Sequence, residues 1–80
     1  MSMNESVGSR PVDLLNAAKG KTVLVELKNG HSLTGKLVAF DMHVNLTLED
    51  TEEKKDDQTL RKLGSIFVRG DMIILISPTV

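Results

Sequence analysis

The sequence predicts an all-β fold: a small, open, five-stranded, bent antiparallel barrel with a short N-terminal helix. Three observations predict it. Apolar and polar side chains alternate in several short runs, which is the spacing of strands. Asn29-Gly30 separates two of these runs and is the strongest short signal for a hairpin. Gly35 and Gly64 each interrupt a run, which indicates a bend that lets a strand curl.

The N-terminal part of the chain divides at Pro11. Residues 1–10 are polar and aperiodic, so we expect a flexible N-terminus, followed by a single domain over residues 11–80. Pro11 to Lys19 is expected to form a helix, because Pro suits the first turn and Gly20 suits the position after the last. A helix of two to three turns is unstable alone, so this one is expected to pack on the sheet.

The first two strands flank the Asn29-Gly30 hairpin. Thr22 to Lys28 alternates, with Val23, Val25 and Leu27 on one face. His31 to Phe40 follows and contains the bend at Gly35.

Three further strands complete the sheet. The sequence predicts strands over Val44–Glu49, Gln58–Val68 and Met72–Ile76, with a charged loop at Asp50–Asp57 and a tight turn at Arg69–Asp71. All links are short, so neighbours in sequence are expected to pair antiparallel.

Composition limits what the protein can be. Eighty residues allow one small domain, and the absence of cysteine excludes a disulfide. Two histidines argue against a structural zinc site, and no metal or cofactor is expected. A net charge of −1 and a pI of about 6.1 argue against nucleic-acid binding by bulk charge, although they allow a small local site. With no long apolar segment or leader pattern, we expect a cytoplasmic protein.

The last two strands are more apolar than a small barrel requires. Ile66–Val68 and Met72–Ile76 do not alternate, which implies that both of their faces are covered. An open barrel also leaves strand edges, and bare apolar edges promote aggregation. Edges that pair head to tail between subunits close into a ring when the rotation allows. We therefore predict a ring-shaped homo-oligomer, whose subunit number stays open.

Two polar breaks carry the candidate site. Asp41, His43 and Asn45 occupy alternate positions in the break after Phe40, and Arg69-Gly70-Asp71 separates the last two apolar runs. Asp and Asn are also ordinary turn formers, so either break alone would suggest only a turn. We expect the fold to bring the two breaks together.

At this point the chain resembles the Sm-like (LSm) family, of the archaeal kind. The resemblance spans Pro11 to Pro78 and rests on three segments, TVLVELKNG, LTGKLVAFDMHVNLTLED and LGSIFVRGDMIILI. Gly35, Asp41 and Asn45 match the first Sm motif, and Arg69-Gly70 matches the second. Val44 is a departure, since the family often has Met there.

The resemblance implies the Sm fold, which is SH3-like, and a heptameric ring built by pairing the fourth strand of one subunit with the fifth of the next. It implies binding of uridine-rich single-stranded RNA, in RNA processing, decay or chaperoning. It also implies one base pocket per subunit. The matching residues are Asp41, His43, Asn45, Arg69, Gly70 and Asp71.

These residue types suit recognition of a splayed base. The flat groups of His43 and Arg69 can stack on it, and the amide of Asn45 offers a donor and an acceptor that complement the edge of uracil. Cytosine lacks the ring N–H donor, so it would face like groups.

Three further residues have supporting roles. Asp41 is expected to orient Asn45 or the turn backbone, and Asp71 to hold Arg69 flat or to fix its own turn. Gly70 allows a positive φ and a close approach of backbone to the base.

Two alternatives remain open. An enzyme could use Asp41 and His43 as an acid–imidazole pair with Ser32 or Ser65 as nucleophile, but no nucleophile elbow or metal set accompanies them, and we expect no enzyme. The other alternative is an oligomeric structural or protein-interaction scaffold that binds no RNA. It shares the apolar edges and requires nothing of His43, Asn45 or Arg69.

Overall fold

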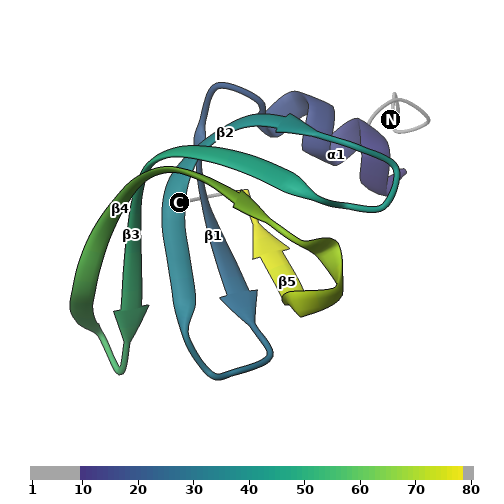
Figure 1. The fold of residues 1–80 in the computed structure, drawn as a ribbon. Helices are drawn as coiled ribbons and strands as arrows, with labels where there is room; N and C mark the ends of the chain where they lie inside the picture. Colours follow the sequence, from purple (N-terminus) through teal and green to yellow (C-terminus); the bar gives the residue numbers. More distant parts are fainter. Residues whose placement is uncertain (1–9, 79–80) are drawn as a thin grey trace, which may run out of the picture.

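A computed structural model describes residues 10–78 as one helix and five strands, joined by short links (Figure 1). The elements are α1 (Pro11–Ala18), β1 (Thr22–Leu27), β2 (Ser32–Phe40), β3 (Leu46–Lys55), β4 (Gln58–Val68), the 3-10 turn η1 (Gly70–Met72) and β5 (Ile73–Ser77). The flexible N-terminus predicted for residues 1–10 lies outside the described residues except for Arg10, and so does the end of the predicted domain, residues 79–80.

The strands form one antiparallel sheet in the order β4-β3-β2-β1-β5. In Figure 1 the long strands β2, β3 and β4 curve strongly, and α1 lies across one end of the sheet. The predicted fold class, an open five-stranded bent barrel behind a short helix, is confirmed. The described part has a single α-helix, α1, and its eight residues are too few to cross a membrane.

Two glycines produce the bends, as predicted. At Gly35 the register between β2 and β3 shifts, and a Cβ there would lie 2.9 Å from the Thr51 hydroxyl and 3.1 Å from the Glu49 carbonyl oxygen. Gly64 has φ +70° and pairs with Thr51 where the β3–β4 register shifts. Both bends therefore pack around Thr51 in the middle of β3.

The charged loop predicted at Asp50–Asp57 is wrong. β3 continues to Lys55, and the turn to β4 contains only Asp56 and Asp57, both with positive φ. Strand alternation accounts for the difference. Thr51 and Glu53 point inward and are buried, whereas the charged side chains between and beyond them face outward. A charged run can therefore form a strand when its inward-facing charge has partners.

The pairing predicted between the last two strands is also wrong within one chain. β5 pairs with β1, not with β4, so β4 and β5 form the two free edges of the sheet. The turn between them is a 3-10 turn that redirects the chain, and the Lys28 N–H donates to the Met72 carbonyl at 2.9 Å. This contact leads β5 onto the open edge of β1.

The core lies inside the curl of the sheet. Val23, Val25 and Leu27 are buried, which confirms the predicted face of β1. From α1 only Ala18 is buried, while Val12 and Leu14 remain 43% and 50% exposed. The buried apolar residues are Ala18, Val23, Val25, Leu27, Leu33, Leu37, Leu46, Leu48 and Val68.

Candidate functional site

The Asp41 carboxylate organises the turn between β2 and β3. Its Oδ1 accepts the backbone N–H groups of His43 at 2.9 Å and Asn45 at 3.0 Å. Its Oδ2 accepts the side-chain amide of Asn45 at 3.0 Å. Val44 adopts φ +62°, and its backbone N–H donates to the Asp41 carbonyl at 3.0 Å. The predicted orienting role of Asp41 therefore has a direct geometric basis.

Asn45 links this turn to the second polar break. Its Oδ1 accepts the Gly70 backbone N–H at 2.7 Å, although the two residues are 25 positions apart in sequence. The structure thus brings the two breaks together, as the sequence predicted. The Asn45 amide is oriented from both ends, by Asp41 on its nitrogen and by Gly70 on its oxygen. One N–H and one oxygen lone pair remain available to a ligand.

Gly70 is required here because the backbone of the other turn approaches it closely. The glycines with positive φ among residues 10–78 are Gly20, Gly30 and Gly64, so Gly70 does not use the positive φ that glycine allows. A Cβ on Gly70 would instead overlap the His43 carbonyl oxygen and lie 3.0 Å from the Val44 carbonyl. The close approach is between two stretches of backbone, which pack directly against each other.

The two flat side chains of the candidate site are on the surface. His43 is exposed, and the Arg69 side chain is 74% exposed. Arg69 Nη2 donates to Asp71 Oδ2 at 3.1 Å, so Asp71 contacts Arg69 as predicted. Such an exposed ion pair contributes little to stability. Its effect is to restrict where the guanidinium points.

The electrostatics of the turn keep Asp41 ionised. The hydrogen bond from the Asn45 side chain, with backbone N–H groups from Asn45 and His43, holds the pKa of Asp41 below its ordinary value of 3.8. An ionised carboxylate only accepts hydrogen bonds. Asp41 therefore fixes the nitrogen of the Asn45 amide toward itself at neutral pH, which leaves no ambiguity about which end faces Gly70.

The contacts do not assemble the proposed acid–imidazole pair. The hydrogen bond between Asp41 and His43 uses the backbone N–H of His43, not its ring. Ser32 begins β2, about 26 Å of strand away from Phe40 at the other end. Within residues 10–78, no group of His, Cys, Asp and Glu side chains is arranged to hold a metal ion.

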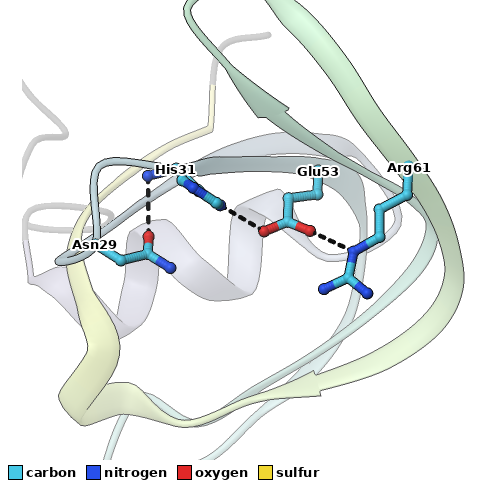
Figure 2. Close-up of polar contacts among 4 residues, drawn as sticks. All are labelled: Asn29, His31, Glu53 and Arg61. Atoms are coloured by element: carbon cyan, nitrogen blue, oxygen red, sulfur yellow. Dashed lines mark hydrogen bonds and ion pairs between the residues drawn. The ribbon is translucent and has the colours of Figure 1, made fainter.

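A second polar cluster lies on the inner face of the sheet (Figure 2). Glu53, only 7% exposed, accepts from Arg61 Nε at 2.7 Å and lies 2.7 Å from His31 Nδ1. The Asn29 side chain accepts the His31 backbone N–H at 2.9 Å. This cluster was not predicted, because Glu53 was expected to lie in a loop. The strand alternation that continues through Thr51 and Glu53 was the signal that could have found it.

A groove of about 410 Å³ lies between α1 and β5. Leu14 and Leu15 of α1 line one wall, and Ile73 to Ile76 of β5 line the other. His43, Val44 and Gly70 also line it, so the turns of the candidate site form part of its wall. The groove is an apolar surface that the described chain does not fill.

Comparisons with known proteins show the family of the chain. Residues 13–78 match the LSM domain family. The chain is similar to an snRNP Sm-like protein of Methanococcoides burtonii, with 42% identity over 72 residues that cover 90% of this chain and 100% of the relative. It is similar to the structure of the Pyrococcus abyssi Sm protein in complex with a uridine heptamer, with 39% identity and a TM-score of 0.87, over 89% of this chain and 100% of that one. It is also similar to a heptameric archaeal Sm protein, with 45% identity and a TM-score of 0.78, over 84% and 97% of the two chains.

Proposed function

Because the chain belongs to the LSM domain family, we propose that it forms a heptameric ring that binds uridine-rich single-stranded RNA, with one base pocket in each subunit. The observation that carries the proposal is the contact between Asn45 and Gly70, which joins the two turns into one site. The similar Pyrococcus abyssi protein was solved with a uridine heptamer, and a similar archaeal Sm protein is a heptamer.

The base pocket is proposed to read uracil in two ways. His43 and Arg69 present flat, exposed groups on which a base can stack, and stacking contributes about 1–3 kcal/mol per base without selecting its identity. Asn45 selects. Its remaining N–H faces a uracil carbonyl, and its oxygen accepts the uracil ring N–H. Cytosine offers a bare ring nitrogen at that position, so its binding leaves two acceptors facing each other.

Assembly into a ring turns weak sites into strong binding. One pocket on a protein of net charge −1 has little electrostatic attraction for RNA. A ring repeats the pocket around its axis, so each bound base raises the effective concentration of the next. This favours tracts of uridines over isolated ones.

The proposal is for a binding protein, not an enzyme. The site offers stacking surfaces and an oriented amide, and the contacts of Asp41 support a positioning role. The cellular process served by binding, among RNA processing, decay and chaperoning, and the cytoplasmic location stay predictions.

The alternative is an oligomeric scaffold that binds no RNA. The specific observation in its favour is the apolar free edge of β5, where Ile74 is 58% and Leu75 45% exposed. That edge serves assembly in both proposals. The scaffold, however, gives no role to the hydrogen bonds that orient Asn45.

Native mass spectrometry of the pure protein tests the proposal, alone and with short oligo-U or matched oligo-C. A heptamer that takes up oligo-U and not oligo-C is the expected result. A closed oligomer indifferent to both would favour the scaffold. A monomer would contradict the ring and the function that depends on it.

A further inference from the structure

The groove between α1 and β5 leaves large apolar side chains exposed to solvent. Leu14, Ile74 and Leu75 lie on or beside it and are 50%, 58% and 45% exposed. Apolar surface of this extent costs free energy in water, roughly 25 cal/mol for each Å² left uncovered. Large exposed apolar patches mark surfaces that bind a partner.

A second copy of this chain supplies that partner. The sheet order leaves β4 and β5 as unlike free edges, so their pairing between copies is head to tail and continues around a ring. β4 also has exposed large apolar residues to offer, namely Leu60 at 48% and Phe67 at 65%.

Ring symmetry indicates that Phe67, not Leu60, is the exposed residue of β4 that meets β5 of the next subunit. Rotation about one axis keeps equivalent residues at equal distances from it. The end of β4 and the start of β5 flank the same turn, Arg69 to Met72, so both lie at similar distances from the axis. The end of β4 in one subunit therefore meets β5 of the next. Leu60 lies seven residues earlier, about 23 Å along the strand, whereas the five residues of β5 span only about 17 Å.

We propose that Phe67 of one subunit fills the groove between α1 and β5 of the next, and that this contact holds the base-binding turns of that next subunit in place. The second part follows from what lines the groove. His43, Val44 and Gly70 form part of its wall, and Gly70 packs so closely on His43 and Val44 that an added Cβ would overlap them. A phenyl ring in the groove would therefore contact the residues that form these turns.

The inference rests on the proposed ring and RNA binding, and it adds that the two are coupled. If subunit contact favours the binding-competent arrangement of the turns, then oligo-U must favour the ring by the same factor. A coupled site of this kind is incomplete in a free subunit, even though every residue that touches the base belongs to one chain.

Substitution of Phe67 tests the coupling, with Leu60→Ala as the matched control on the same strand. Native mass spectrometry across a urea series gives the dissociation midpoint of each ring. Fluorescence anisotropy at concentrations where the ring is intact gives the affinity for oligo-U. We expect Phe67→Ala to lower the midpoint and to weaken oligo-U binding about fivefold or more, and Leu60→Ala to change neither. Phe67→Leu, which keeps a side chain in the groove, serves for the affinity measurement if the Ala variant does not assemble.

Two results would overturn the inference. One is a Phe67→Ala ring with the same midpoint as the Leu60→Ala ring. The other is a weakened ring of either Phe67 variant that still binds oligo-U with wild-type affinity, which would separate assembly from the base site. Failure of the wild-type protein to assemble or to bind oligo-U would instead refute the proposed function itself.

Discussion

Asn45 shows how one side chain can organise a site formed from distant segments. Its nitrogen donates to Asp41 in its own turn, and its oxygen accepts the backbone N–H of Gly70 from the turn before β5. Both ends of the amide are therefore fixed before a ligand arrives. A pre-oriented amide loses little conformational entropy on binding, which favours its use as a reader of base edges.

Replacement of Asn45 by Ala should reduce selectivity for uridine. The methyl group removes the donor and acceptor that distinguish uracil from cytosine, while His43 and Arg69 can still stack. We expect affinity for oligo-U to fall about tenfold, the value of one to two hydrogen bonds, and affinity for oligo-C to change much less. Asn29→Ala is the matched control, because Asn29 caps a hairpin turn within its own sequence and contacts His31. Equal losses for both oligonucleotides would rule out edge reading by Asn45.

The second prediction at the scale of single residues concerns Gly70. A methyl group at Gly70 would overlap the His43 carbonyl oxygen, which is backbone and cannot rotate away. Gly70→Ala should therefore separate the two turns and weaken oligo-U binding about fivefold or more, as when the hydrogen bond to Asn45 is lost. Equilibrium binding on assembled rings measures the effect.

Gly20→Ala is the control for this change. Gly20 has φ +83° but open space around its Cα, so Ala there costs about 1 kcal/mol of backbone strain without touching the site. Wild-type binding by the Gly70→Ala ring would show that the contact between the turns has no functional role.

At the scale of elements, β3 is held to its neighbours by a buried charge. Glu53 lies opposite Leu33 of β2 and Arg61 of β4, and it contacts both His31 and Arg61. A carboxylate can be buried on an apolar face only when such partners replace water. The His31 bond first, and then the Arg61 bond, hold the pKa of Glu53 below its ordinary value of 4.5.

A pH dependence follows from this lowered pKa. A carboxyl group whose pKa is lower in the folded state contributes stability above its unfolded pKa, and this contribution is lost as the pH falls through the folded value. Glu53→Gln should therefore lower the urea midpoint of unfolding near neutral pH, and the difference from wild type should shrink below about pH 4.

The matched control is Glu52→Gln, since the neighbouring side chain points to the opposite face of β3. Urea titrations at several pH values measure the dependence. A Glu53→Gln deficit that stays constant from neutral pH to pH 3 would show that packing, not charge, accounts for the role of Glu53.

At the scale of the whole molecule, the sheet has two edges that no other strand of the described residues covers. Its order places β4 at one edge and β5 at the other, each with backbone groups free to pair and exposed apolar side chains. Such edges are an aggregation hazard unless they are covered. A closed ring covers every edge with another subunit, so the same apolar residues that would promote aggregation stabilise a defined assembly.

A charge on the β5 edge should prevent this assembly. Ile74→Glu places an ionised group where the next subunit is expected to pack, and burial of an unpaired charge costs several kcal/mol. We expect monomers in native mass spectrometry, whereas Val12→Glu, at an exposed position on α1, should leave the ring intact. An intact Ile74→Glu ring would show that this edge is not an interface.

The sequence by itself determined the elements with local causes. Local strand and turn patterns located β1, β2 and β4 to within a residue at each end. Asn29-Gly30 located the first hairpin, and Gly35 and Gly64 located the bends. The residues of the two polar breaks were also identified from the sequence, first by their types and then by the resemblance. Each of these signals depends on a few neighbouring residues, so it is visible without the fold.

Only the tertiary structure decided what depends on distant contacts. It extended β3 to Lys55 because Glu53 finds partners in His31, just before β2, and in Arg61 of β4. It paired β5 with β1 because η1 turns the chain toward that edge. It also showed that Gly70 is needed for close packing on His43, not for a positive φ. The physical reason is the same in each case: the free energy of a buried charge, a free edge or a close approach depends on residues that meet only after the chain has folded.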